Sequence, residues 1–208
     1  MKHLLTLLLA STLIGCGTAN IRDDYKLDTA SGEGLVIGSI TYDGAMAEYR
    51  INYEREGGGT RNYFSAGAAM YPAMPRNDFP TNSFRGALFS SALPAGRYLI
   101  RKSSTSGGMV NSHSTNPETI AFEVAPGKAT YLGNFHFVPV RRFNILIGAK
   151  VIHLDQLARD QPVFQKRYPA LTNTPIKTIE IRNGGLGESV KTEIQVITPG
   201  GAVISTDR

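Results

Sequence analysis

The chain has 208 residues, of which 41% are hydrophobic and 19% charged, and its formal net charge is +5 at pH 7. This composition fits one globular domain and excludes both a largely disordered chain and a protein that spans a membrane many times. With one cysteine, neither an intramolecular disulfide nor a zinc finger is possible.

The N-terminal segment has the composition of an export signal. A short basic lead, Met1 to His3, precedes a mostly apolar run from Leu4 to Ile14. As a helix, this run would span about 16 Å, roughly half of a bilayer's hydrocarbon core. It is too short for a lasting transmembrane helix, and small residues at its end are typical of a secretory signal.

The end of this signal reads Leu13, Ile14, Gly15 and Cys16, and it resembles the lipobox of bacterial lipoproteins. In that family, the peptide is cut just before the cysteine, whose thiol is joined to a diacylglycerol. The resemblance implies that 1–15 is a lipoprotein signal peptide, that Cys16 is acylated, and that the membrane is reached through this covalent lipid. Since Gly17 and not Asp follows, it also implies the periplasmic face of the outer membrane. The alternative is an ordinary signal peptide that contains a cysteine.

The segment 16–34 is polar and rich in small residues, which predicts a lipidated cysteine followed by a flexible tether. Regular structure is expected from Leu35. An apolar stretch at 35–42, the turn signal Asp43-Gly44 and an alternating run at 45–54 together predict a β-hairpin. After three consecutive glycines, 61–66 is expected to be a third strand.

The middle of the chain alternates turn signals with short strands. Prolines make 67–81 an irregular segment, and strands are expected at 84–89 and 97–101 around the turn Pro94 to Gly96. Ser, Thr, Asn and Gly dominate 103–117, which is expected to be a loop. Alternation on both sides of Pro126-Gly127 predicts a second hairpin, formed by 120–124 and 131–137.

Three phrases of the sequence resemble a family of small bacterial lipoproteins with a β-sandwich domain of unknown function. They are LPAGRYLI at 93–100, VAPGKATYLGNF at 124–135 and KRYPAL at 166–171. The first is also similar to a turn and strand of transthyretin-like and carboxypeptidase-regulatory-like modules. The resemblance implies a mainly β fold: an antiparallel immunoglobulin-like or transthyretin-like β-sandwich over 35–208 with a short C-terminal helical insertion.

The C-terminal third contains the helical segment, expected near 155–168. After a strand at 144–152, Asp155 can cap a helical turn, and Pro162 is expected to start a second helical segment that Pro169 ends. The runs 176–182 and 190–197 are expected to pair around a glycine-rich turn. Too few residues follow Leu171 for an independent core, so we expect one domain.

The search for catalytic and metal-binding residues finds none. Three histidines lie beyond the signal, namely His113, His136 and His153, and they form no H-E-x-x-H motif. The phrase from Tyr63 to Gly67 lacks the first glycine of G-x-S-x-G. We therefore expect no catalytic residue, no metal site and no cofactor, although acidic residues paired only in space are left open.

Two functions remain as hypotheses. The first is a membrane-anchored, non-catalytic interaction or accessory module of the cell envelope, with an envelope protein or the cell wall as partner and no nucleic acid. The alternative is an envelope glycan-binding module or hydrolase that uses the loops 67–81 and 103–117. In either case, the residues expected at a binding surface are Tyr63, Tyr71, Phe79 and His113.

Overall fold

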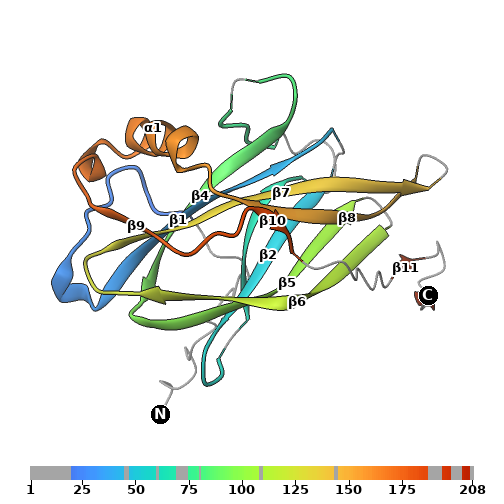
Figure 1. Cartoon of the computed structure of the whole chain (residues 1–208), viewed down its shortest axis with the longest axis horizontal. Helices are drawn as coiled ribbons and strands as arrows, with labels where there is room; N and C mark the ends of the chain where they lie inside the picture. The colour runs from blue at the N-terminus through green and yellow to red at the C-terminus, as the bar shows by residue number, and fades with distance from the viewer. Residues whose placement is uncertain are drawn as a thin grey trace, which may run out of the picture.

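A computed structural model describes residues 20–44, 47–59, 61–68, 75–79, 81–107, 110–142, 145–186, 194–197 and 203–206. Within these ranges the fold is mainly β, with two six-stranded sheets that face each other and one short α-helix (Figure 1). The expected sandwich-like architecture with a helix in the C-terminal third is therefore confirmed at this level.

The first sheet, sheet A, is mixed. Its strand order is β10-β8-β7-β1-β4, and β9 pairs with β7 beyond the end of β8. Because β1 and β9 both run parallel to β7, the expectation of a purely antiparallel sandwich is wrong. The strands are β1 (Glu33–Tyr42), β4 (Arg85–Pro94), β7 (Ala129–Arg142), β8 (Ile145–Leu154), β9 (Ile176–Thr178) and β10 (Gly184–Gly185).

The second sheet, sheet B, has the strand order β12-β11-β6-β5-β2-β3. Each pair of neighbouring strands in it is antiparallel. Its two longest strands, β5 and β6, pair with each other along most of their length. The strands are β2 (Glu48–Arg55), β3 (Asn62–Gly67), β5 (Gly96–Gly107), β6 (Val110–Val124), β11 (Ile194–Ile197) and β12 (Val203–Thr206).

Both predicted hairpins join strands of different sheets, so both predictions are wrong. The chain passes from β1 in sheet A to β2 in sheet B at Asp43-Gly44, and from β6 back to β7 at Pro126-Gly127. Strand β1 pairs instead with β4 and β7, and it is buried on both faces. Alternation and turn residues located these strands and turns, but they do not determine which strands pair.

Two further expectations are also wrong. The predicted loop 103–117 belongs to β5 and β6 wherever it is described, and Ser104 pairs with His113. Small hydroxyl residues can form a strand when alternate ones are buried, as Ser103 and Thr105 are. The expected last strand pair does not form either, because β9 pairs with β7, and β11 pairs with β6 and β12.

One helix, α1 (Leu157–Arg167), continues through Pro162, so no second segment starts there. The N-cap residue is Gln156, and the carboxylate of the preceding Asp155 accepts a hydrogen bond from the backbone N–H of Leu157, the first helical residue, at 3.1 Å. Phe164 and Tyr168 pack together, with ring centroids 5.2 Å apart. Short 3₁₀ turns precede β1 (η1, Thr29–Ser31) and follow α1 (η2, Pro169–Leu171).

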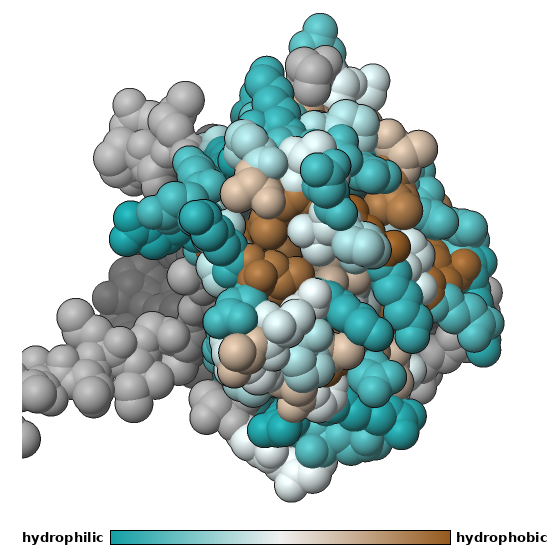
Figure 2. Space-filling model, turned by 90° about the vertical axis from the view of Figure 1, so that its left-hand side faces the viewer, coloured by the Kyte–Doolittle hydropathy of each residue, from teal (hydrophilic) through white to brown (hydrophobic). Residues whose placement is uncertain are grey.

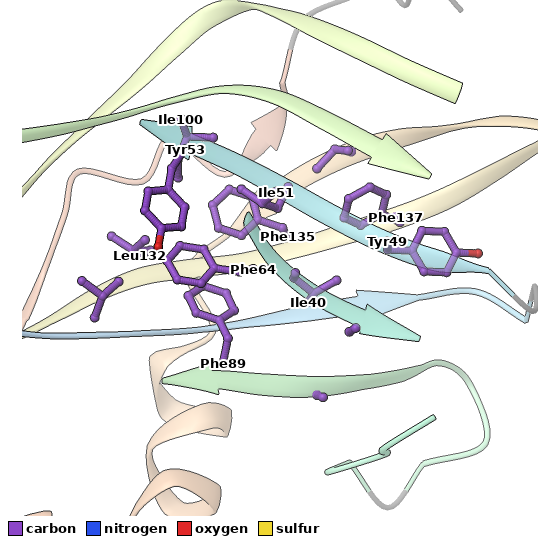
Figure 3. Close-up of a cluster of buried hydrophobic side chains, with 14 of the residues drawn as sticks. Ile40, Tyr49, Ile51, Tyr53, Phe64, Phe89, Ile100, Leu132, Phe135 and Phe137 are labelled. Carbon is purple, nitrogen blue, oxygen red and sulfur yellow. The ribbon is translucent and has the colours of Figure 1, made fainter. Parts of the chain in front are cut away.

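Two hydrophobic cores lie on the two faces of sheet A. The core between the sheets is rich in aromatic rings, and Phe64 stacks on Phe89 at 4.2 Å and on Tyr53 at 4.5 Å (Figure 3). The second core lies on the outer face of sheet A, where Leu35, Ile37 and Tyr131 meet residues of α1. Sheet A is thus the middle layer of the molecule.

The segment expected to be a flexible tether is part of the domain wherever it is described, from Asn20 onward. The Ile21 side chain is buried, and its backbone N–H donates to the carbonyl of Ser90 at 2.7 Å. The Asn20 side-chain oxygen accepts from the Ser90 N–H at 2.7 Å. Tyr25 and Leu27 then pack against the outer core.

Candidate functional site

A buried carboxylate joins α1 to sheet A. Asp160 is only 2% exposed, and one of its oxygens accepts hydrogen bonds from Ser39 Oγ at 2.6 Å and from the Tyr131 hydroxyl at 2.7 Å. The other oxygen accepts from Arg159 Nε at 2.8 Å. Burial, followed by the nearby Asp160 carboxylate, raises the pKa of Tyr131, which stays a hydroxyl donor.

The hydrogen bonds continue along the outer face of sheet A. Asn134 Nδ2 donates to Ser39 Oγ at 2.9 Å and to Thr41 Oγ1 at 3.0 Å. Thr41 Oγ1 in turn lies 2.9 Å from His136 Nδ1. We call this set the outer-face network; its members are Ser39, Thr41, Tyr131, Asn134, His136, Arg159 and Asp160.

The outer-face network superficially resembles a catalytic arrangement. The hydroxyl of Thr41 contacts one nitrogen of His136, and the other nitrogen lies 3.4 Å from a carboxylate oxygen of Asp43. A nucleophile must meet its substrate, however, and Thr41 is only 1% exposed, with its oxygen also bonded to Asn134. The geometry therefore supports a structural role, in which polar residues fix the position of α1 on the sheet.

A hollow with a volume of about 430 Å³ lies between β6 of sheet B and strands β8 and β10 of sheet A. We call it the edge pocket. Its wall from sheet B is Thr119, Ile120 and Ala121 of β6, and its wall from sheet A includes His153 of β8. The remaining wall is the segment between β9 and the end of β10, with Glu180, Arg182, Asn183, Gly184, Gly185 and Leu186.

The chemistry of the edge pocket suits binding better than catalysis. His153 is 4% exposed, stacks on Phe135, and has Nε2 2.7 Å from the carbonyl oxygen of Leu132. Burial lowers the pKa of His153, so the ring is neutral at pH 7 and Nε2–H donates to that carbonyl. Glu180 is the only carboxylate among the lining residues, whereas glycoside hydrolysis ordinarily uses two.

The residues expected to form a binding surface do not come together. Phe79 is 3% exposed and lies under the Arg159 guanidinium at 4.4 Å, so its ring is not part of the molecular surface. Tyr63 is half-buried beneath Arg50 at 4.3 Å, and His113 is exposed on β6, three strands away from β3. Three strand spacings amount to about 14 Å. Tyr71 lies outside the described residues, as do Leu13, Ile14, Gly15 and Cys16.

Sequence reasoning missed the outer-face network and the edge pocket. The available signal was polar residues at alternate positions of otherwise apolar strands, such as Ser39 and Thr41 in β1 and Asn134 in β7. That pattern indicates buried hydrogen bonds but not their partners. Asp160 is contributed by a helix more than a hundred residues further on than Ser39, and no spacing in the sequence reveals the contact.

Two searches of the described residues were negative. They contain no group of three or more His, Cys, Asp or Glu side chains that could hold a metal ion. In the same residues, no helix is both long enough and apolar enough to cross a membrane.

Comparison with known proteins adds no family to this picture. The chain matches no protein-family model, and searches of curated proteins and of solved structures found no match. Its function must therefore be argued from its own residues.

Proposed function

We propose that this chain is a lipid-anchored protein of the bacterial cell envelope whose β domain is a non-catalytic interaction or accessory module. The observation that carries the proposal is the signal-like sequence before Cys16. Within four residues of that cysteine, the chain is already packed on the domain. A domain that starts so soon after the acceptor cysteine is suited to work at the membrane surface.

The non-catalytic part of the proposal is supported by the state of the polar side chains. The hydroxyl, imidazole and carboxylate groups that come together on sheet A bond to one another beneath α1. The edge pocket offers one carboxylate and a neutral histidine. The hydroxyl that contacts a histidine in the outer-face network, that of Thr41, is only 1% exposed, whereas a nucleophile must reach its substrate.

The proposal includes kinship with immunoglobulin-like or transthyretin-like sandwiches. Two facing sheets support it, and the parallel pairing of β1 with β7 counts against it. The outer membrane's periplasmic face is the proposed location, because Gly17 follows the cysteine.

Acylation is tested by growing bacteria that express the chain with an alkyne-tagged fatty acid. We expect label on the wild-type protein, which should sediment with membranes, and no label on Cys16→Ser. Intact-mass measurement should show loss of 1–15 and addition of acyl chains. An unlabelled wild-type protein that is cut elsewhere and recovered in the soluble fraction would overturn the proposal.

The interaction role is tested by crosslinking intact cells and identifying partners by mass spectrometry. The matched control is Cys16→Ser, which keeps the whole domain. A partner captured only with the acylated form supports an envelope module. If the anchored protein captures no partner and instead turns over a cell-wall substrate, the non-catalytic proposal is wrong.

The edge pocket favours a second candidate, the binding of a small glycan or other polar ligand. Its lining combines backbone at Gly184 and Gly185 with an arginine, a glutamate and apolar side chains, a mixture found in small-ligand sites. This site differs from the loops expected from sequence. A glycan screen on the wild type and Gly184→Phe tests it, because Gly184 pairs with His153 of the pocket wall and a Cβ there meets nothing within 4 Å. Only the wild type should bind.

A further inference from the structure

The free edge of sheet A is covered at regular intervals along β4. The backbone N–H of Asp78 donates to the carbonyl of Gly86 at 2.9 Å, and the Asp78 carboxylate accepts from the Leu88 N–H at 2.8 Å. Two residues further along β4, the Ile21 N–H donates a hydrogen bond to the Ser90 carbonyl, and the Asn20 side-chain oxygen accepts one from the Ser90 N–H. The N-terminal segment therefore continues the protection of this edge, which would otherwise be open to another strand.

This attachment fixes where the chain enters the domain. The Ile21 carbonyl also accepts a hydrogen bond from the Tyr168 hydroxyl at 3.4 Å, and Tyr168 is fully buried. Asn20 is thus bonded to β4, and Ile21 is bonded both to β4 and to Tyr168, which follows α1. Any force on the preceding residues acts on the domain at this point.

The covalent distance from Cys16 to this point is short. Four residues of fully extended chain span at most about 14 Å, so Asn20 cannot lie further than that from the α-carbon of Cys16. A flexible tether through residue 34 would have allowed a much greater separation. The packing of Asn20 and Ile21 removes that freedom.

The surface near this point offers little other attraction for a membrane. Three of its arginines each face an aspartate, in the pairs Arg22 with Asp24, Arg76 with Asp78 and Arg167 with Asp23, and two further cations, Arg85 and Lys166, are exposed. Hydrophobic side chains at the end of the molecule that carries α1 and the N-terminal segment are divided by polar ones (Figure 2). Among the described residues, Val140 is the only exposed large hydrophobic side chain.

We infer that the β4 edge, with the segment from Asn20 to Asp24 and the end of α1, lies against the phospholipid headgroups of the membrane that holds Cys16. The inference rests on the proposed acylation of that cysteine. The short covalent link keeps this edge within about 14 Å of the anchor, whereas the opposite edge of sheet A has no such limit. The opposite edge of sheet A, at β8 and β10, therefore faces away from the membrane and leaves the edge pocket accessible to soluble partners.

The single cysteine makes a direct test possible, because acylation consumes its thiol and an introduced cysteine is then the only free one. Asp24→Cys places a fluorophore near the expected contact, at a side chain that is 73% exposed. Lys150→Cys is the matched control, exposed on β8. In sheet A, Lys150 lies three strand spacings from Ser90 across the sheet and seven residues from it along β7. Together these steps separate the two positions by roughly 25 Å, with β1 and β7 between them (Figure 1).

The acylated full-length proteins are reconstituted into phosphatidylcholine vesicles that contain a headgroup spin label, and fluorescence quenching is measured. We expect quenching at position 24 to be at least several-fold stronger than at position 150, and unchanged in high salt. An insertion of about 20 Gly and Ser residues after Gly17, with a root-mean-square span of about 25 Å, should bring the two signals close together.

Each outcome has a definite meaning. Equal quenching at both positions in the uninserted protein would overturn the inference, and so would a strong signal at position 24 that the insertion leaves unchanged. Mass measurement of the same samples shows whether Cys16 is acylated, and it therefore distinguishes a wrong orientation from a wrong proposed function. If Cys16 carries no lipid and the protein does not bind vesicles, the anchor itself is wrong; if the lipid is present, only the orientation is at issue.

Discussion

Asp160 illustrates how a polar residue can be placed inside this domain. The carboxylate is buried, so its charge must be compensated by donors, and Ser39, Tyr131 and Arg159 supply them at 2.6 to 2.8 Å. Arg159 is partly exposed, and its guanidinium also stacks over Phe79. The pair therefore connects the helix, the sheet and the segment at 75–79.

Replacing Asp160 with asparagine should destabilise the protein. The amide has nearly the same shape, but it replaces one acceptor with a donor that faces donors of the sheet or of Arg159. We expect a loss of about 2–4 kcal/mol in the free energy of unfolding, measured by urea denaturation. The control is Asp24→Asn at the exposed pair with Arg22, which should change stability by less than about 1 kcal/mol. Equal effects would contradict the structural role of Asp160.

His153 predicts a dependence of stability on pH. Its pKa is lowered in the folded state by burial, whereas in the unfolded chain it returns to about 6.5. Below that pH the unfolded state binds a proton that the folded state does not, so the free energy of unfolding falls as pH falls. The slope for one group is at most about 1.4 kcal/mol per pH unit.

The measurement compares wild type with His153→Gln in urea at pH 7.5 and 5.5. Glutamine keeps an N–H donor for the Leu132 carbonyl but does not titrate. The stability difference between the two proteins should therefore shrink at the lower pH. A difference that stays constant would show that His153 does not cause the pH dependence.

At the scale of elements, the contact between β1 and β7 depends on glycine. The register shifts between Ile37 and Ser39, opposite Gly133, which has a φ of 93°. A Cβ at Gly133 would lie 2.6 Å from His153 Nε2 and 2.9 Å from Ile181 Cδ1. Both the backbone conformation and the close packing therefore require glycine here.

Gly133→Ala should accordingly lower the free energy of unfolding by about 2 kcal/mol or more. Gly184→Ala is the matched control, since a Cβ there meets nothing within 4 Å and the backbone is not left-handed. Thermal unfolding of the two variants checks this: only the first should melt at a clearly lower temperature than wild type. A wild-type melting temperature for Gly133→Ala would contradict the packing described at this bulge.

The whole molecule needs the segment before β1. Residues 20–32 cover the outer core with Ile21 and Leu27 and occupy part of the β4 edge. A chain that starts at Asn20 should fold, whereas one that starts at Glu33, the first residue of β1, should be less stable by at least about 2 kcal/mol, the worth of one buried large side chain. It should also aggregate through the uncovered edge. Urea unfolding and light scattering on both chains test this, and equal stability and solubility would contradict it.

The sequence by itself determined the features that depend on near neighbours. The pattern on which the proposed export signal and its cysteine rest is continuous in the sequence. The turns at Asp43-Gly44 and Pro126-Gly127 follow from local backbone preference, and alternation at 48–54 marks a strand. The hydrogen bond from the Leu157 N–H to Asp155 is local in the same way. These features need no knowledge of what the segment will contact.

Only the tertiary structure decided the features that depend on distant partners. A turn signal reverses the chain but does not say whether the next strand pairs beside the last or crosses to the facing sheet, because both bury the same alternating side chains. The polar segment 20–32 is ordered where it meets Ser90, and the β5 part of 103–117 pairs with β2, which lies far earlier in the chain. The outer-face network and the edge pocket exist only where such segments meet, which is why the sequence did not reveal them.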